Sequence, residues 1–462
     1  MRRFTLALVL QIAWVTLLKA WALSQPLPDQ EIANRIQAYL EPFGETGNLS
    51  GSVLVARGGR ILFQKSYGMA NYELLVSNSS KTRYHIASVS KPFLATAILQ
   101  LQEQGRLRVT DPVSRYVRDF PKGDRITLAN LLEHTSGIPN INDLDDYDTF
   151  ARSPHMLEQL VAKFAGLPLE FEPGSDTRYS NSNYNLLALI LEKVTGVSYE
   201  KYLHDHIFGP AGMLDSGADS DASRLIPFAA SGYAPAGIAA NVKAPYVDWS
   251  NKTGNGSLYS TVDDLYRFDR ALNTETLLKS ATRQKYFVEG PDNFYGWYIF
   301  QRVGHRLMAA KGHSPGFTAE LDRFPDDDVT IIILSNSSET ASQDPVAGAL
   351  AAIVFGQKVS PPALRAVPIP ESVLKSYTGQ YQYGADYFSP NVKFTLTAEP
   401  GFLRMQIEDH HAPVVPLSDT EFLERYFFGH IAMSKDAEGK VTGLTCRYGK
   451  KTFVARRLES KD

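Results

Sequence analysis

The stretch Ser88-Val89-Ser90-Lys91-Pro92 opens a predicted helix, and an apolar face at helical spacing follows from Phe93 to Leu101. Proline is tolerated here because it falls in the first turn. Residues three apart on a helix are neighbours, so the Ser88 hydroxyl and the Lys91 amine are predicted to face each other. A serine needs a base to become a nucleophile, and a buried lysine can lose its proton and serve as that base.

A Ser-x-x-Lys pattern is common by itself, and this chain contains two further copies, Ser198–Lys201 and Ser372–Lys375. In both copies the serine is predicted to cap a short helix. The copy at Ser88 is distinguished by a second loop, in which Tyr179 and Asn181 lie two residues apart just before another predicted helix. Residues two apart in an extended segment point to the same side, so a phenol and an amide are expected side by side over a pocket.

The remaining histidine-containing motifs are interpreted as structural. His134 lies in the loop Leu131–Pro139, after a short helix, and is expected to support the fold rather than to catalyse. His204 and His206 are two apart at a predicted helix end and would not face each other. The group Glu408–His411 is expected to form a solvated turn. The sequence therefore predicts no metal site, and no cofactor is expected.

A rival nucleophile is present at Gly312-His313-Ser314-Pro315-Gly316, which matches Gly-x-Ser-x-Gly, the nucleophile elbow of α/β-hydrolases. An elbow requires a buried strand before the serine and a helix after it. Residues Phe317 to Phe324 are followed by a turn at Pro325–Asp328, and the next element is a predicted strand, Val329 to Leu334. Little room is left for a helix, so an α/β-hydrolase using Ser314 is kept only as an alternative.

The order of predicted elements indicates a sheet assembled from both ends of the first unit. Gly51–Ala56 and Ile61–Tyr67 flank a turn and are predicted to form a β-hairpin. Two further strands are predicted far downstream, at Tyr295–Arg302 and Val329–Asn336. The intervening sequence is richer in helical patterns. An α/β (α+β) fold is therefore expected, with a helical region inserted between the strands.

These ordered motifs together resemble the serine β-lactamase-related hydrolases, which include class C β-lactamases, low-molecular-weight penicillin-binding proteins, D-aminopeptidases and some esterases. The resemblance extends over roughly Ile32 to Phe355 and implies a β-lactamase/transpeptidase-like domain, an antiparallel sheet flanked by helices. By resemblance, Ser88 is the acylated nucleophile, Lys91 its base, Tyr179 a proton relay and Asn181 a ligand of the substrate amide. The residues alone leave open whether Lys91 or Tyr179 is the neutral base. The resemblance rests on Ser88–Lys91, Leu131–Pro139, Phe171–Asn181, Phe208–Met213, Gly256–Leu265 and Gly312-His313.

The third family motif departs from the usual pattern. It is Lys-Thr-Gly or His-x-Gly on a strand that lines the pocket, whereas His313-Ser314-Pro315 stands here. The ungapped match implies that His313 is the cationic or polar substrate binder. One oxyanion donor would be the Ser88 N–H. The second is expected from this strand at Gly316, because Pro315 has no N–H to donate.

Both ends of the chain are predicted to lie outside the hydrolase unit of residues 25–358. Residues 1–24 read as a signal peptide, with two arginines, an apolar run and a small-residue cleavage site. A secreted or periplasmic location follows, with no membrane span after signal cleavage. A Pro-rich linker is predicted at 359–370, and a small antiparallel β-domain at 371–462 resembles the β-barrel appendages of some family members. Such a linker indicates few contacts between the two units.

Composition limits the remaining function classes. The net charge is −3, so the footprint of nucleic-acid binding is missing, and the only cysteine, Cys446, excludes an intrachain disulfide or a Cys-rich metal site. The sequence predicts an exported serine hydrolase that forms an acyl-enzyme with a small-molecule or peptide substrate: a D-amino peptide, small ester or β-lactam. A non-catalytic penicillin-binding-protein-like sensor that binds cell-wall peptide remains the alternative.

Overall fold

The structure is a computed structural model that describes residues 27–288, 293–338, 343–408 and 410–459. The predicted signal peptide, residues 1–24, lies outside these residues. Within them, no helix is long and apolar enough to cross a membrane.

A seven-stranded antiparallel sheet forms the centre of the first unit. Its elements are α2 (Asp29–Glu45), β1 (Gly51–Arg57), β2 (Arg60–Tyr67), β10 (Asn293–Phe294), β11 (Trp297–Arg302), β12 (His305–Ser314), β13 (Phe317–Phe324), β14 (Val329–Ser335) and α12 (Gln343–Val354). The strand order is β10-β11-β12-β13-β14-β1-β2. The N-terminal hairpin thus pairs with β14, near the end of the unit, from Gly51 opposite Ser335 to Arg57 opposite Val329. The predicted sheet built from both ends is confirmed.

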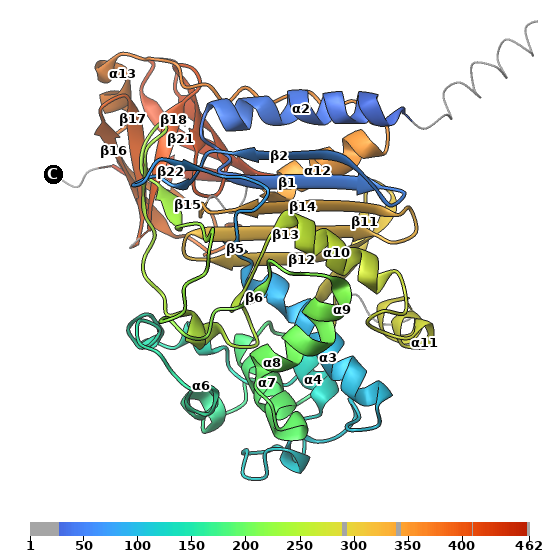
Figure 1. Ribbon diagram of the computed structural model, residues 1–462. Helices are drawn as coiled ribbons and strands as arrows, with labels where there is room; N and C mark the ends of the chain where they lie inside the picture. Colours follow the sequence, from blue (N-terminus) through green and yellow to red (C-terminus); the bar gives the residue numbers. More distant parts are fainter. Residues whose placement is uncertain (1–26, 289–292, 339–342, 409, 460–462) are drawn as a thin grey trace, which may run out of the picture.

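Both faces of the sheet are buried. Along β14, Ile331 and Ile333 pack with α2 and α12, whereas Ile332 and Leu334 belong to the core of the helical region. Figure 1 shows α2 along one face of the sheet and the helical region on the opposite side. This burial explains why β14 is a continuous apolar run rather than an alternating one.

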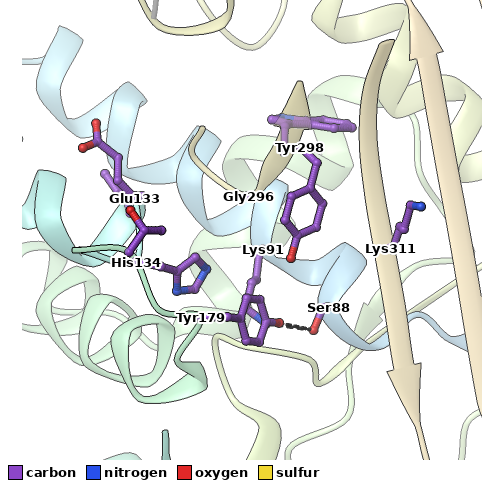
Figure 2. A pocket seen from close by; sticks show the side chains of 11 residues that line it. Ser88, Lys91, Glu133, His134, Tyr179, Gly296, Tyr298 and Lys311 are labelled. Carbon is purple, nitrogen blue, oxygen red and sulfur yellow. Dashed lines mark hydrogen bonds between the residues drawn. The ribbon is translucent and has the colours of Figure 1, made fainter. Parts of the chain in front are cut away.

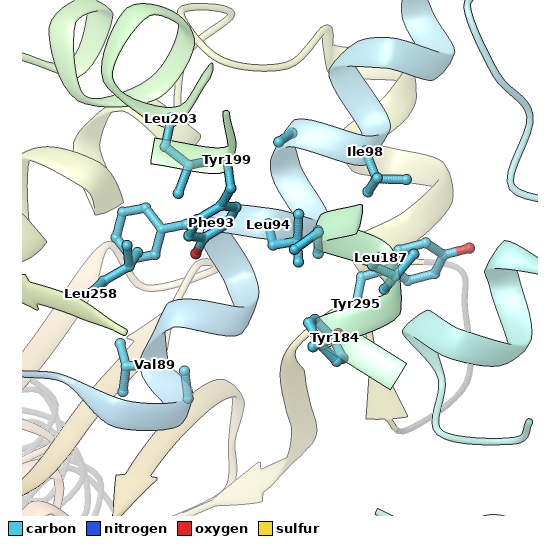
Figure 3. Packing of buried hydrophobic residues seen from close by; sticks show 14 of the residues in the cluster. Val89, Phe93, Leu94, Ile98, Tyr184, Leu187, Tyr199, Leu203, Leu258 and Tyr295 are labelled. Atoms are coloured by element: carbon cyan, nitrogen blue, oxygen red, sulfur yellow. The ribbon is translucent and has the colours of Figure 1, made fainter. Parts of the chain in front are cut away.

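The helical region surrounds one fully buried helix. Its elements are β3 (Met69–Asn71), β4 (Val76–Ser77), β5 (Tyr84–His85), η1 (Ala87–Ser90), α3 (Lys91–Glu103), η2 (Val113–Arg115), α4 (Leu128–Leu132), η3 (Ile141–Asp143), α5 (Tyr147–Phe150), α6 (Leu157–Ala165), α7 (Asn181–Thr195), α8 (Tyr199–Leu203), η4 (His204–Phe208), α9 (Gly209–Ala211), β6 (Gly217–Ala218), β7 (Tyr233–Pro235), β8 (Asn241–Lys243), η5 (Trp249–Lys252), β9 (Leu258–Ser260), α10 (Val262–Leu272), α11 (Ser280–Arg283) and η6 (Gln284–Val288). The sequence pattern predicts one apolar face on α3, but every residue from Lys91 to Leu101 is buried. Phe93 stacks on Phe268 with ring centroids 3.9 Å apart, and further apolar side chains enclose the helix (Figure 3).

The segment around Ser314 is a hairpin, which overturns the nucleophile-elbow alternative. Strand β12 turns directly into β13, with Ser314 opposite Phe317 and Pro315-Gly316 as the two-residue turn. Strand β14 follows β13, so no helix comes after Ser314. The side chain of Ser314 is buried rather than raised on an exposed turn. The alternative of an α/β-hydrolase using Ser314 is therefore wrong.

The C-terminal unit is a closed eight-stranded antiparallel barrel. Its elements are α13 (Glu371–Ser376), β15 (Gly379–Tyr383), β16 (Lys393–Glu399), β17 (Phe402–Ile407), β18 (His410–Pro416), β19 (Glu421–Glu424), β20 (Gly429–Lys435), β21 (Val441–Tyr448) and β22 (Lys451–Arg457). Strand β15 pairs with both β16 and β22, which closes the barrel. The prediction of a small antiparallel β-domain is confirmed.

The barrel packs tightly against the first unit, contrary to the prediction of few contacts. Phe428, in the β19–β20 turn, stacks on Phe43 of α2 with ring centroids 5.5 Å apart. The buried Arg425 donates hydrogen bonds to Asn48 Oδ1 at 2.9 Å and to the carbonyl oxygens of Gly47 and Gly237. The two units therefore share a core although a proline-rich linker joins them. The residues that make this contact lie in turns far from the linker.

Removal of the barrel is accordingly expected to destabilise the first unit. A truncated chain ending at residue 368 would expose Phe43, and it should be insoluble or melt well below the full chain. In the full chain, Phe428→Ala should cost about 3 kcal/mol through the cavity it leaves, whereas Phe388→Ala, at an exposed barrel position, should cost little. Thermal unfolding measures both. A soluble truncated protein with an unchanged melting temperature would contradict the shared core.

Candidate active site

Ser88 lies on a sharp turn that leads into the buried helix α3. The preceding residue, Ala87, has φ of +46°, in the left-handed region that costs a non-glycine residue energy. The N–H of Val89 donates to Ile86 O at 3.1 Å, which closes the turn η1. Helix α3 begins at Lys91, one turn after the serine. The packing of α3 therefore fixes Lys91, while the strained turn presents Ser88 to the cleft.

The amine of Lys91 is enclosed by polar atoms. Its Nζ lies 2.8 Å from Ser88 Oγ, 2.9 Å from Asn181 Oδ1 and 2.8 Å from Asn255 O. Only 2% of the residue is exposed. Burial lowers the pKa of Lys91 well below its ordinary value, and the positive charge of Lys252 lowers it further.

The loop that supplies Asn255 O depends on one glycine. Gly254 has φ of +85°, and a Cβ there would lie 2.3 Å from Tyr184 O on α7. Only glycine allows the loop to approach α7 this closely. The side chain of Asn255 is held in turn, donating to Asn185 Oδ1 at 3.1 Å. This close packing aims the carbonyl of Asn255 at Lys91.

Tyr179 and Asn181 approach Ser88 from the opposite wall, as the sequence predicts for a pair in one loop. The hydroxyl of Tyr179 lies 2.7 Å from Ser88 Oγ (Figure 2). Burial of that hydroxyl raises the pKa of Tyr179, although its hydrogen bond with Ser88 opposes the shift. The Nδ2 group of Asn181 donates to Asn142 Oδ1 at 2.9 Å, so Asn181 Oδ1 is directed at Lys91.

His134 holds the tyrosine loop in place, consistent with its predicted structural role. Its ring lies 4.5 Å from the ring of Tyr179, and its Nδ1 accepts the N–H of Ser180 at 3.1 Å. Burial lowers the pKa of His134 to about 3, so the ring is neutral at pH 7 and can accept that bond. His134 also lines the cleft, next to Glu133.

The third wall of the cleft contains two residues that sequence reasoning missed. Tyr298 on β11 and Lys311 on β12 both line the cleft with Ser88, and Figure 2 shows the Tyr298 hydroxyl directed toward Ser88 and Lys91. Lys311 forms ion pairs with Asp344 and with the buried Glu320. These carboxylates hold the pKa of Lys311 above its ordinary value despite partial burial, so it remains a cation. The sequence did contain a signal for Lys311, which lies two residues before His313 on a predicted strand. Residues two apart lie on the same face of a strand.

The predicted substrate binders on β12 and its turn lie in different places. His313 lines the cleft with Ser88 and Asn181. Desolvation by the cleft walls lowers the pKa of His313 to about 4, with a contribution from Lys252, so it is a neutral polar group at pH 7. Gly316 lies in the turn beyond β12, where its N–H donates to Ser338 Oγ at 2.7 Å. The structure therefore brings His313 to the nucleophile and does not bring Gly316.

The other histidines of the sequence analysis are not gathered into a metal-binding group. His204 pairs with the neighbouring Asp205, and His206 lies against the ring of Tyr202. Within the described part of the chain, no three His, Cys, Asp or Glu side chains meet as candidate metal ligands.

Residues 32–354 match the family described as Beta-lactamase. The chain belongs to this family. It is 31% identical over 426 residues to penicillin-binding protein 4* of Bacillus subtilis (strain 168), covering 86% of this chain and 92% of the relative. The predicted family resemblance is confirmed.

Two solved structures show the same fold. A penicillin-binding protein homologue from Pyrococcus abyssi is 22% identical and covers 91% of this chain and 99% of its own, with a TM-score of 0.62. A D-amino acid amidase from Ochrobactrum anthropi SV3 is 21% identical and covers 70% of this chain and 99% of its own, also with a TM-score of 0.62. The first unit is a β-lactamase/transpeptidase-like domain, followed by the closed barrel.

Proposed function

We propose that the protein is an exported serine hydrolase that cleaves an amide or ester through an acyl-enzyme on Ser88. One observation carries the proposal: Ser88 Oγ lies within hydrogen-bond distance of both Lys91 Nζ and the Tyr179 hydroxyl. A nucleophile, a base and a proton donor are thus in contact before any substrate arrives. A binding protein would have no need of all three groups around one serine.

The hydrogen-bond pattern favours Lys91 as the base. Two of its three neighbours, Asn255 O and Asn181 Oδ1, can only accept, so they take the two N–H groups of a neutral amine. The lone pair then faces Ser88, whose hydroxyl donates to it. Tyr179, whose raised pKa keeps it protonated, donates its own hydroxyl to Ser88 Oγ.

Two backbone N–H groups are proposed to bind the oxyanion. The first belongs to Ser88 itself. The second follows from the β12–β13 ladder, in which pairs alternate between hydrogen-bonded and non-hydrogen-bonded. The two-residue turn makes Ser314 and Phe317 a hydrogen-bonded pair of the ladder. The next pair, His313 and Thr318, is therefore a non-hydrogen-bonded pair. The N–H of His313 therefore points away from β13, toward the edge of β12 that faces Ser88, which makes it a better donor than Gly316.

The proposed reaction has two stages. Ser88 Oγ attacks the carbonyl carbon and its proton passes to Lys91. Collapse of the tetrahedral intermediate breaks the bond to the leaving group, which takes a proton from Tyr179 as Lys91 reprotonates that hydroxyl. Water then attacks the acyl carbon with Lys91 as base, and the acid leaves as Ser88 regains its proton.

A D-amino peptide with a free carboxylate is the proposed substrate class. Lys311 is a cation within the cleft, held there by Glu320 and Asp344, and it can pair with a carboxylate on the leaving-group side. The relatives named as a penicillin-binding protein and a D-amino acid amidase support this choice. Small esters and β-lactams remain rival substrates, and the cell-wall sensor remains the non-catalytic alternative.

Intact-mass measurement against a matched substrate panel tests the proposal. The panel contains a D-Ala-D-Ala peptide, its L-stereoisomer, the C-terminal amide of the D-peptide, a small activated ester and a penicillin. The proposal predicts turnover of the D-peptide and loss of rate with the amide. Acylation of the protein by compounds of the panel without product release would support the non-catalytic cell-wall sensor. Fast turnover of the ester alone would support an esterase.

Export is proposed from residues 1–24 alone. The mature protein is expected to begin at Gln25 and to be found in a secreted or periplasmic fraction. N-terminal sequencing of protein recovered from that fraction measures the cleavage site. Full-length protein retained with Met1 in the membrane fraction would contradict it.

Lys252 is expected to set the pH range of activity. It is buried, its Nζ lies 5.3 Å from the ring centroid of Tyr147, and its charge lowers the pKa of Lys91. Lys252→Gln removes this repulsion, so the pKa of Lys91 should rise. The acidic limb of the profile of kcat/KM against pH, where Lys91 is protonated, should move to higher pH by about one unit.

A second lysine over an aromatic ring supplies the control for this prediction. Lys285 lies 5.1 Å from the ring centroid of Tyr286, outside the cleft. Lys285→Gln should leave the acidic limb in place. A limb that stays fixed in Lys252→Gln, or moves to lower pH, would show that Lys252 does not act on the base.

A further inference from the structure

A second cavity, of 470 Å³, opens at one end of the C-terminal barrel. It is lined by the turns that follow β15, β17 and β19 and by residues of β17, β18, β19 and β21, and none of its residues lines the cleft around Ser88. Barrel mouths are common sites for small ligands because inward-facing side chains converge there. The aromatic and thioether side chains used below are Tyr387, Phe388, Met405, Tyr426, Phe427 and Tyr448.

The aromatic rings stand at steep angles to one another and so enclose a space. Phe427 and Tyr448 have centroids 6.2 Å apart and an interplanar angle of 86°. Tyr387 and Phe388 are 5.2 Å apart at 67°. Rings in this arrangement offer faces and edges from several directions. Phe388 and Phe427 are 63% and 43% exposed, so their rings are accessible to a ligand.

A buried carboxylate lies in the same wall. Glu424 is fully buried, and its Oε2 accepts the N–H of Phe427 at 2.9 Å while Oε1 accepts the N–H of Tyr426 at 2.5 Å. The turn after β19 therefore fixes both oxygens. The adjacent residue, Arg425, projects the other way and donates to the first unit. Consecutive residues thus place a carboxylate at the cavity and a guanidinium at the interface between the units.

The carboxylates around the cavity belong to Glu408 and Glu424, and its basic side chains are His410 and His411. Among the described residues that line it, two are glutamates and none is lysine or arginine. Burial raises the pKa values of Tyr387 and Tyr448, and the carboxylate of Glu424 adds to both shifts. The face of a rim ring already attracts an ammonium group, because Lys451 Nζ lies 5.3 Å from the centroid of Phe388.

We propose that the barrel cavity binds an organic cation, a substituted ammonium group on an apolar body. The aromatic faces bind the cation through their quadrupoles, and Glu424 supplies the opposite charge. The apolar body occupies the space beside Met405. An anionic ligand such as a fatty acid would instead meet the carboxylate of Glu424, and His410 and His411 are the basic side chains among the described residues that line the cavity. This site is independent of Ser88 and of the hydrolase function proposed for it.

Binding can be tested with two molecules of the same shape that differ in charge. Choline and 3,3-dimethyl-1-butanol are isosteres, one cationic and one neutral. Saturation-transfer NMR with the full mature chain, its Ser88 first blocked by a fluorophosphonate, should show choline binding at least tenfold tighter than the alcohol. Equal binding of the two, or binding of neither, would overturn the proposal. Calorimetry with benzyltrimethylammonium measures the affinity of a larger cation.

Two variants locate the site and one serves as control. Glu424→Gln keeps the shape of the side chain and should weaken binding of benzyltrimethylammonium at least tenfold. Phe427→Leu, at an exposed ring, should weaken it several-fold without risk to the fold. Glu421→Gln, on the same strand but exposed, should leave it unchanged. Unchanged affinity in folded Glu424→Gln and Phe427→Leu proteins would place the cation elsewhere and overturn the inference.

Discussion

Replacement of Ser88 by alanine is expected to abolish covalent labelling by a fluorophosphonate and to reduce hydrolysis to the background rate. The loss should be on the order of 10⁴-fold or more, because among the described residues Ser88 carries the one hydroxyl in contact with both Lys91 and Tyr179. Ser88 Oγ is 2.8 Å from Lys91 Nζ and 2.7 Å from the Tyr179 hydroxyl. Mass spectrometry of the digested, labelled protein identifies the modified residue.

Ser314→Ala is the matched control, because Ser314 lies in the Gly-x-Ser-x-Gly motif that predicts a rival nucleophile. Ser314 is buried in the β12–β13 hairpin and does not line the cleft. Labelling and turnover of Ser314→Ala should therefore remain close to those of the unmodified protein. An adduct found on Ser314 in the Ser88→Ala protein would overturn the assignment of the nucleophile.

The residues around the nucleophile could be predicted from the sequence because the members of each pair lie close together in the chain. Ser88 and Lys91 are joined by one helical turn, and Tyr179 and Asn181 by two residues of extended chain. The hairpin β1–β2 was likewise predictable, since two apolar segments flank the turn that contains Gly58 and Gly59. The Gly-x-Ser-x-Gly match was resolved by the same local logic: the sequence after Ser314 had room for a strand and not for a helix.

The electrostatic part of the site could not be predicted because it depends on distant segments. Lys252 acts on Lys91 across 161 residues, from a loop that its sequence gives no reason to place there. The sequence analysis gave the cationic role to His313, whereas we propose it for Lys311, two residues earlier on β12, because ion pairs with Glu320 and Asp344 keep Lys311 charged. The pKa of each group reflects burial and neighbouring charge, and both are properties of the assembled fold.

The packing of the barrel was missed for a related reason. The linker is rich in proline and lacks helix or strand between Val354 and Glu371, so it suggests a loose connection. The contact is made instead by Arg425 and Phe428, which the sequence places in an unremarkable turn. Composition of a linker therefore says little about whether the units on either side share a core.

Lys91→Met is expected to reduce the rate of acylation by about 10² to 10⁴. Methionine keeps much of the volume of lysine on the buried helix, so the fold should persist, but it cannot accept the proton of Ser88. Stopped-flow acylation by an activated ester measures the rate. A melting temperature close to that of the unmodified protein would show that the loss is chemical.

The chain offers its own control for this substitution, because Lys201 also lies three residues after a serine. Ser198 caps α8 by accepting the N–H of Lys201, as predicted, and the exposed amine of Lys201 pairs with Asp205 at 2.7 Å. Lys201→Met should therefore leave acylation unchanged. Near-normal acylation in Lys91→Met would remove the lysine from the mechanism and leave Tyr179 as the base, since it is the one other titratable side chain within hydrogen-bond distance of Ser88 among the described residues.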